Sequence, residues 1–579
     1  MMARLDRKFL AVPLIATSFD WGIRSVAPLP CAPTLSDVAV SLCLYSLAIF
    51  PALLLAGIAW LNRLRVALLG APFALLAANF VFAVGTKSRW ELALAGLAGL
   101  CAGALLSRLS LRALLLSGAC AGAVFGWSTA MAPVRMADSS GPSVLLVVLD
   151  TTSAAHLSTY GYTKPTSPHL TDLARRSLLY KRALATASWT LPSHASIFSG
   201  LYASELGFDG TSLYWGAEIG SIAGDLEAAG REAHAISANP MILAYRELQT
   251  GFRRVWGVRE LTQPLLLGIL DRVRHREGFQ SRGSRVTDLA LDWVDRLSPK
   301  RRPWFLFLNY LDPHAPYDPP QHERQQFAPG IDPGSVAADT QEYNSGRLAL
   351  TPRIRAAMSA LYDGEVAAED AALGRLLKEL GARGYNDSNL LLIVTADHGE
   401  SLGEHGFVGH LLGMPDVVLQ VPLLLSGPGI RPGQLQEPVQ LNQLRATIRA
   451  ILALPPIPRI APPLPPWGPA PSLLIAEHPE PRWYLEELQG FNPHVTPDAW
   501  RGDWVAVERD GVKVVFDDNG HGATYDLRSD PTEDDPRPLT AGVELVRAYH
   551  DRAATFRTVR SVKPSEGTIE ALHQLGYVH

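Results

Sequence analysis

The sequence predicts an α/β protein, in which helices cover both faces of a mostly parallel β-sheet, behind a block of N-terminal transmembrane helices. Two observations lead to this fold class. The first 135 of the 579 residues are strongly apolar, whereas the rest has the mixed composition of a soluble domain. In that remainder, continuous apolar runs alternate with segments of helical periodicity, which is typical of parallel sheets flanked by helices.

The N-terminal part is predicted to be a membrane anchor over residues 1–135. About 20 residues are needed to cross a bilayer, and the long apolar runs here lack the polar face of a soluble helix. These runs cover residues 38–61, 66–85, 92–107 and 113–134. A shorter apolar segment, 9–19, follows a basic N-terminus and would be a signal-like region or a further span. We therefore expect four or five membrane helices.

The side of the membrane on which the remainder lies is left open by the charge pattern. Models with four and with five spans both place seven basic residues inside and four outside. A five-span protein exports the remainder of the chain, and a four-span protein keeps it in the cytoplasm.

After a short polar linker over residues 136–141, apolar runs of the kind found in buried parallel strands each end near a polar side chain. The run S-V-L-L-V-V-L ends at Asp150, and W-F-L-F-L-N-Y ends shortly before His314. The run L-L-L-I-V-T leads to Asp397 and His398, and V-P-L-L-L-S is expected to be a fourth strand. Because ligands of such sheets bind beyond the carboxyl ends of the strands, we expect a functional site there.

Between these strands the sequence predicts helices. One covers residues 167–177 and opens with Ser-Pro, and a long one covers 352–380. In the stretch A-S-W-T-L-P-S-H-A-S, Thr190 stands just before an apolar turn, with Pro192 two residues later. Thr190 could be the N-cap of a helix, or its hydroxyl could be a nucleophile.

The strand ends suggest a metal-assisted reaction. Asp150, Asp397 and His398 are suitable ligands for a divalent ion such as Zn²⁺ or Mn²⁺. A hydroxyl beside that ion could be activated to attack an anionic ester. The same residues also have plain structural explanations: Asp150 could cap a helix, Asp-His-Gly could be a turn, and the histidines at 314, 405 and 410 could face solvent.

Composition excludes several other functions. The net charge of −4 offers no basic surface for nucleic acid. The only cysteines lie in the anchor: Cys31, Cys43, Cys101 and Cys120. The rest of the chain therefore has no disulfide, thiolate metal site or cysteine nucleophile. The oligomeric state is left open.

From about Ser143 onward, several motifs in order resemble the sulfatase-like branch of the alkaline phosphatase superfamily. They are V-V-L-D-T-T, S-W-T-L-P-S-H-A-S-I-F-S-G, N-Y-L-D-P-H-A-P-Y-D-P-P, L-Y-D-G-E-V-A-A-E-D and T-A-D-H-G-E-S-L-G-E-H-G-F-V-G-H. Near the end, A-T-Y-D-L-R-S-D-P-T-E-D resembles the smaller C-terminal subdomain of that family. The resemblance implies an alkaline phosphatase-like catalytic domain over 142–465 and an α+β subdomain over 466–579.

The resemblance also implies roles for individual residues. The metal ligands would be Asp150, Thr190, Asp397 and His398. The catalytic residues would be Thr190 as the nucleophile, His314 and His410 as groups that bind the ester oxygens or protonate the leaving group, and His405 as a weaker candidate for the same pocket. A divalent ion is expected as the cofactor, with Zn²⁺ or Mn²⁺ favoured and Ca²⁺ as an alternative.

Departures from the family pattern bear on the substrate. Sulfatases carry C/S-x-P-x-R, in which the first residue becomes formylglycine, but here Thr190 and His194 stand at the first and last positions. A threonine cannot give that aldehyde. Thr151 replaces a second aspartate beside Asp150, and His398 stands where sulfatases tend to have asparagine. These features resemble the phosphoethanolamine and phosphoglycerol transferases of the cell envelope, which also have N-terminal spans, and this favours the five-span model with an exported catalytic domain.

Three functions follow as hypotheses. The first is a multi-pass membrane protein whose metal-dependent catalytic domain hydrolyses or transfers phosphate esters of envelope lipids or glycans. The second is a sulfuric ester hydrolase that works without formylglycine. The third is an inactive scaffold that binds glycan.

Overall fold

The computed structural model describes residues 141–555, apart from 209, 211–218, 258–281, 298–301, 338 and 518. The predicted membrane spans therefore lie outside the described part of the chain. Within that part, no helix combines the length and the apolar character that crossing a bilayer requires. The number of spans and the exported location remain predictions.

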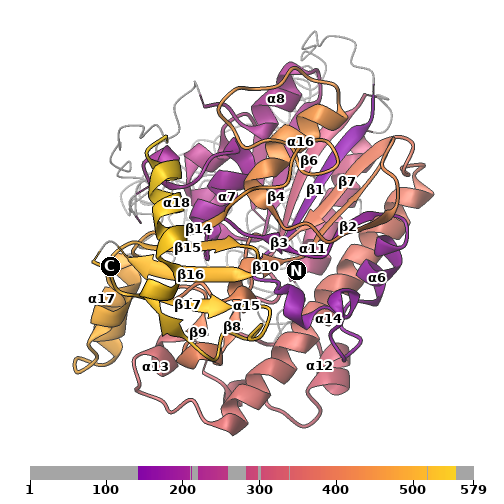
Figure 1. Ribbon diagram of the computed structural model, residues 1–579. Helices are drawn as coiled ribbons and strands as arrows, with labels where there is room; N and C mark the ends of the chain where they lie inside the picture. Colours follow the sequence, from indigo (N-terminus) through magenta and orange to yellow (C-terminus); the bar gives the residue numbers. More distant parts are fainter. Residues whose placement is uncertain are drawn as a thin grey trace, which may run out of the picture. The chain divides into compact units, whose positions relative to one another are not determined.

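An eight-stranded sheet forms the centre of the described part of the chain (Figure 1). Its strands, in spatial order, are β12 (Gly433–Leu435), β2 (Leu178–Tyr180), β11 (Leu423–Ser426), β7 (Leu390–Thr395), β1 (Ser143–Leu149), β6 (Trp304–Tyr310), β4 (Glu232–Ser237) and β5 (Arg254–Gly257). The four runs that the sequence predicts to be strands are β1, β6, β7 and β11. The first three are buried along their whole length, as their continuous apolar sequences require.

The sheet is mixed rather than uniformly parallel. Strands β7, β1, β6, β4 and β5 run parallel to one another, whereas β11 is antiparallel to both β7 and β2. The reason lies in the connection. Leu423 at the start of β11 pairs with Thr395 at the end of β7, so the chain re-enters the sheet at the edge where it left. A parallel return would need a crossover helix that leads back to the opposite end of the strands, and the only α-helix between β7 and β11 is the four-residue α15 (Asp416–Leu419).

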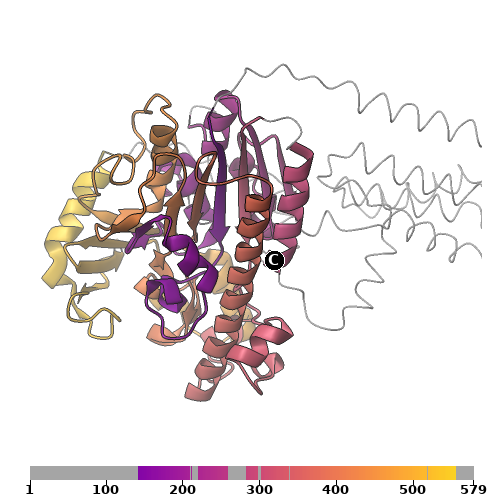
Figure 2. The same cartoon turned by 90° about the vertical axis from the view of Figure 1, so that its right-hand side faces the viewer.

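Helices cover both faces of this sheet (Figure 2). On one face, α14 (Pro352–Ala382) packs against α11 (Arg282–Leu297) and α6 (Pro168–Ala174). On the other face lie α7 (Thr190–Ser199) and α16 (Leu444–Ile451), which contact each other. The long helix begins where the sequence predicts, because Thr351 caps it and Pro352 occupies its first turn.

A second sheet of five antiparallel strands follows in the chain. It is formed by β14 (Leu474–His478), β15 (Trp504–Arg509), β16 (Val512–Asp517), β17 (Gly522–Asp526) and β18 (Arg537–Pro538), and it is accompanied by α17 (Arg482–Phe491) and α18 (Val543–Ala553). Val507, Val514, Phe516 and Leu545 form its own apolar cluster. This α+β unit lies in the segment where the resemblance places the C-terminal subdomain. The domain boundary at 465/466 remains a prediction.

Candidate active site

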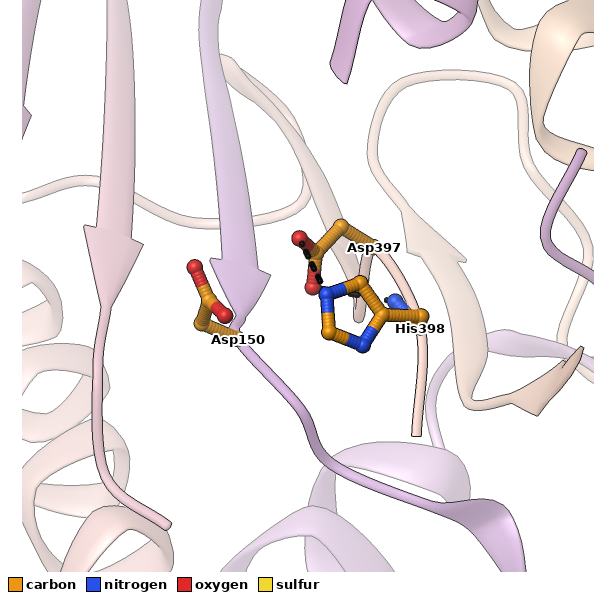
Figure 3. Close-up of side chains that lie close together, drawn as sticks. All are labelled: Asp150, Asp397 and His398. Atoms are coloured by element: carbon orange, nitrogen blue, oxygen red, sulfur yellow. Dashed lines mark hydrogen bonds and ion pairs between the residues drawn. The ribbon is translucent and has the colours of Figure 1, made fainter. Parts of the chain in front are cut away.

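Two strand ends bring three ionisable side chains together at the carboxyl edge of the large sheet (Figure 3). Asp150 directly follows β1, and Asp397 and His398 lie just beyond β7, its parallel neighbour. Their ligand atoms all lie within 4.8 Å of one another, and all three residues are fully buried. The shared edge predicted from the apolar runs is thus the edge at which these groups meet.

Asp150 is held by two asparagine amides. Its Oδ2 accepts hydrogen bonds from Asn239 Nδ2 at 2.7 Å and Asn309 Nδ2 at 3.1 Å, whereas its Oδ1 has no hydrogen-bond partner. Burial, and next the nearby charge of Asp397, raise the pKa of Asp150 to about 6. A carboxylate in this environment needs a positive charge beside it to stay ionised.

Asp397 is oriented by backbone N–H groups. Its Oδ1 accepts from His398 N at 2.9 Å and from Thr151 N at 3.3 Å. Its Oδ2 lies 3.3 Å from both His398 Nε2 and His194 Nδ1. Burial alone would raise the pKa of Asp397, but His398 and His194 outweigh burial and lower that pKa below its ordinary value.

His398 directs one ring nitrogen toward the carboxylates of Asp150 and Asp397. Its Nδ1 lies 2.9 Å from the carbonyl oxygen of Gly399, which can only accept a hydrogen bond, so Nδ1 must carry the proton. Burial lowers the pKa of the ring, which favours its neutral form. The lone pair on Nε2 is therefore available to a metal ion, in the arrangement usual for histidine ligands.

These donors fit a divalent cation. Two carboxylate oxygens without hydrogen bonds, Asp150 Oδ1 and Asp397 Oδ2, lie beside an imidazole nitrogen with a free lone pair. Two buried carboxylates at this separation repel each other, and a cation between them would remove that cost. Oxygen and imidazole ligands suit Zn²⁺ and Mn²⁺, and the carboxylates alone would also suit Ca²⁺.

Thr190 lies next to this group, at the start of α7. The structure does not support the N-cap role considered from the sequence, because Trp189 is the N-cap residue and Thr190 is the first helical residue. The Thr190 hydroxyl instead lies 3.3 Å from His398 Nε2 and 3.5 Å from Asn239 Nδ2. The N-terminus of this ten-residue helix, which favours anions, thus lies next to the candidate metal ligands Asp150, Asp397 and His398.

Of the other predicted histidines, His410 and His314 lie near His398, whereas His405 does not. The His410 ring centroid lies 4.3 Å from that of His398 and 5.5 Å from that of His314, so these three rings form a continuous row. His405, by contrast, is an exposed residue with a φ of +59°. It lines a separate cavity together with residues of the second sheet.

Some residues of the site were not singled out from the sequence. Asn239 and Asn309 hold Asp150, and Glu400 accepts a hydrogen bond from His410 Nδ1 at 2.9 Å. His194 fills the position of the missing arginine, and its Nδ1 donates to the Thr190 carbonyl at 2.9 Å. Asn309 is the next-to-last residue of the run W-F-L-F-L-N-Y, so its position near the strand end could have identified it as a site residue. Asn239 offers no such signal, since S-A-N-P indicates only a helix cap.

The position that the family usually fills with a second aspartate also differs. Thr151 has a φ of +58°, which is unfavourable for a β-branched residue, and it is fully buried. This turn directs its N–H to Asp397, while Tyr362 donates to its carbonyl at 2.6 Å. The Thr151 hydroxyl has no hydrogen-bond partner. The side chain of Thr151 thus offers no charge to a metal ion, but its backbone N–H helps to orient the candidate ligand Asp397.

Comparison with known proteins agrees with the resemblance to sulfatases seen in the sequence motifs. The family described as sulfatase matches residues 142–452, just over half of the chain. An uncharacterized sulfatase, YidJ of Escherichia coli, is 21% identical over 68% of this chain and 82% of its own length. The choline-sulfatase of Rhizobium meliloti is 24% identical over 47% of this chain and 52% of its own length, so the chain spans about half of that relative.

Solved structures show the same fold. The phosphonate monoester hydrolase of Agrobacterium radiobacter aligns with a TM-score of 0.55 and 21% identity, over 73% of this chain and all of that chain. The phosphonate monoester hydrolase of Silicibacter pomeroyi aligns with a TM-score of 0.52 and 19% identity, over 72% of this chain and 96% of that chain.

Proposed function

The chain belongs to the sulfatase family of ester hydrolases, and from this we propose that it is a metal-dependent hydrolase or transferase of phosphate or sulfate esters with Thr190 as its nucleophile. One observation carries the proposal: the Thr190 hydroxyl lies 3.3 Å from His398 Nε2, beside the cluster of Asp150 and Asp397. A hydroxyl that served only the fold would have no reason to be next to three candidate metal ligands.

In this proposal the chain binds and orients both reactants. Asp150, Asp397 and His398 would hold a divalent ion, which when bound supplies positive charge to the ester oxygens and favours an ionised hydroxyl. Thr190 begins α7, so its hydroxyl and the helix N-terminus would both face a substrate anion bound at this end of the helix. Attack by Thr190 would form an ester between its oxygen and the phosphorus or sulfur atom, as the bond to the alcohol breaks.

The departing alcohol needs a proton. In this proposal His410 and His314 supply it, because their rings continue the row that begins at His398. Water would then release the anion from Thr190 in a hydrolase, or a second alcohol would accept it in a transferase. The histidines would take back a proton in that second step.

Phosphate esters are the preferred substrates in this proposal. An unmodified threonine fits a covalent phosphothreonine, and it cannot become the formylglycine of sulfatases. A sulfuric ester hydrolase remains the second candidate, because the related choline-sulfatase is named for that chemistry. In the preferred function the catalytic domain is exported behind the membrane anchor, where it acts on an envelope lipid or glycan.

The experiment is a substrate panel with the full-length protein. A phosphodiester, a phosphomonoester and a sulfate ester are each supplied with Zn²⁺, Mn²⁺ and Ca²⁺ after removal of bound metal by a chelator. We expect turnover of at least one phosphate ester, dependent on added Zn²⁺ or Mn²⁺. Turnover of the sulfate ester alone would instead support the second candidate, and the absence of any turnover with every metal would support an inactive scaffold.

Thr190 is tested by substitution and by trapping. Thr190→Ala should lower kcat by at least about 1,000-fold, since a lost nucleophile removes the covalent route, while the Tm stays within a few degrees. Thr190→Ser should retain part of the activity. In wild type quenched during turnover, mass spectrometry should find the phosphoryl group on the peptide that contains Thr190.

Thr186→Ala is the matched control, because Thr186 is a buried threonine on the same segment whose hydroxyl has no hydrogen-bond partner. It should keep its activity. Near-normal turnover by Thr190→Ala, with no modified peptide in wild type, would refute the nucleophile.

A further inference from the structure

A cavity of about 250 Å³ lies between the loop that carries His410 and the second sheet. The loop contributes Phe407. Strands β15 and β17 contribute Trp504 and Tyr525, and the segment between β14 and β15 contributes Trp500. Trp500, Trp504 and Tyr525 are only partly buried, so their rings are accessible to a ligand. Pockets for drug-sized ligands have roughly 300 to 1,000 Å³, and this one has room for a single ring with its substituents.

The cavity adjoins the active site. Phe407 and Leu412, which line it, flank His410 along the chain. A second lining residue, His478, hydrogen-bonds through Nδ1 to Ser188 Oγ at 2.6 Å, two residues before Thr190. A substrate bound at Thr190 would therefore have its alcohol side within reach of the cavity.

The lining combines apolar ring faces with polar groups. The imidazoles of His405 and His478 stand among the four aromatic residues. Aromatic faces stabilise ligands by burying apolar area, and convergent polar groups orient them. A molecule that matches both features has an apolar C–H face and hydroxyl groups at its edge.

A cation is a poorer match. Aromatic side chains can enclose a quaternary ammonium group, and a carboxylate, Glu533, lies at the cavity. Both oxygens of Glu533 are already engaged, however, because Lys513 Nζ lies 2.7 Å from its Oε1 and the Asp416 N–H donates to its Oε2. Neither oxygen of Glu533 is thus free to face a cation in the cavity.

We propose that this cavity binds a sugar ring, which is the alcohol part of the ester that Thr190 attacks. The part of the inference that concerns the ester rests on the proposed function, whereas the binding of the sugar can be tested without turnover. In this arrangement Trp500 and Trp504 stack on the apolar face of the ring. His405, which the resemblance assigned weakly to catalysis, becomes a residue that contacts substrate hydroxyls.

Binding is measured by saturation-transfer NMR on the full-length protein. The probes are methyl pyranosides of a neutral sugar, an amino sugar and a uronic acid, with choline and benzyl alcohol as competing chemistries. We expect transfer to the ring protons of at least one pyranoside, and at least about a tenfold weaker affinity in Trp500→Ala and Trp504→Ala. That loss corresponds to about 1.4 kcal/mol, in the range of an aromatic contact.

Trp483→Ala is the matched control. Trp483 packs in the same apolar cluster as Trp500 but does not line the cavity, so its loss removes similar packing without removing a contact to the ligand. It should bind the pyranoside as wild type does. Equal losses in Trp483→Ala and Trp500→Ala would overturn the inference, as would binding of choline or benzyl alcohol without any pyranoside.

Failure of the proposed function is distinguishable from failure of this inference. If no ester is turned over but a pyranoside binds through Trp500, the proposed function falls and the sugar site stands. If esters are hydrolysed and no pyranoside binds to wild type, the sugar site falls and the proposed function stands.

Discussion

Glu400 shows how single residues determine what the site can do. It is almost fully buried, and its Oε1 accepts a hydrogen bond from His410 Nδ1 at 2.9 Å. Because a carboxylate oxygen accepts only from a protonated nitrogen, this bond fixes which nitrogen of His410 carries the proton in the neutral ring. His410 Nε2 then faces the substrate with the lone pair of the neutral ring, so the ring must first take up a proton at Nε2 before it can give one to the departing alcohol. Glu400 is thus a positioning residue that acts through His410.

We predict that Glu400→Gln lowers kcat by about 10- to 100-fold, the range seen when supporting partners of site histidines are removed. The amide keeps the shape of the carboxyl group, but it can also donate and so no longer selects one form of the ring. The loss should be larger for alkyl esters than for p-nitrophenyl esters, because only a basic leaving group needs a proton from His410.

The dependence of the rate loss on the leaving group distinguishes a positioning role of Glu400 from a folding defect. A merely structural defect would lower the rates for both esters by the same factor. Glu404→Gln, in the same loop, is the control, since Glu404 bonds to the backbone of its own turn. It should show no such dependence on the leaving group.

The sequence predicted those site residues that follow a strand directly. Asp150, Asp397 and His398 stand after buried apolar runs, and parallel strands bring such positions to one edge. Of the two roles left open for Thr190, the N-cap is excluded, because a cap depends on one residue's backbone angles and Trp189 adopts them instead. Asn239 could not be found, since its contact with Asp150 joins residues 89 positions apart.

At the scale of elements, long periodic or continuously apolar segments were predictable and short ones were not. The strands β1, β6 and β7 and the helix α14 appear where the sequence places them. The direction of β11 was not foreseen, because strand direction depends on the connection rather than on composition. Strands of two or three residues carry no measurable period.

The strand β14 links the second sheet to the active-site segment. An isolated bridge pairs its Glu477 with Ala187, three residues before Thr190. The Glu477 carboxyl group accepts hydrogen bonds from Ser204 N at 2.8 Å and Ser204 Oγ at 2.6 Å. Burial outweighs these bonds and raises the pKa of Glu477 to about 7.

This pKa makes the stability of the fold depend on pH. A carboxyl group with a pKa of about 7 when folded and 4.5 when unfolded contributes stability that is complete below pH 4.5 and is lost as the pH rises through 7. We predict that Glu477→Gln, which cannot ionise, gains up to about 3 kcal/mol relative to wild type between pH 4.5 and pH 8. Denaturant unfolding at several pH values measures this difference.

The adjacent His478 titrates in wild type and variant alike, so its effect cancels in the comparison. Glu544→Gln, at an exposed position of α18, is the control and should show no such gain. A stability difference between Glu477→Gln and wild type that is the same at pH 4.5 and at pH 8 would contradict the prediction.

At the scale of the whole catalytic region, largely buried ion pairs join the second sheet to segments that adjoin the large sheet. Asp416, just after the active-site loop, pairs with Lys513 of β16 at 2.9 Å and with Arg182 at 2.7 Å. Arg182 also contacts Glu508 of β15. Removing one partner of such a buried pair leaves an uncompensated charge, so the contacts favour one arrangement of the sheets. That arrangement brings His478 next to the segment that leads to Thr190.

At this scale the sequence also predicts a membrane anchor, and the two topology models differ in the side of the membrane on which this region would work. The charges of the linkers fit the four-span and the five-span model equally well. The models differ in the number of spans before the catalytic domain, and this number decides the side on which the domain lies. The two models place any given linker on opposite sides of the membrane. We predict five spans and an exported domain, because an envelope ester can be reached only from outside.

Two fusions of the chain in a bacterial host test this prediction. A reporter that is active only outside the cytoplasm should be active when it is fused after Val134 and inactive after Arg65, because three predicted spans lie between these positions. A reporter that is active only in the cytoplasm should give the reverse pattern. If the fusion after Val134 reports the cytoplasm and that after Arg65 the outside, the chain has four spans, and an envelope substrate is excluded. If both fusions report the same side, the short run 92–107 is not a span, and both models fail.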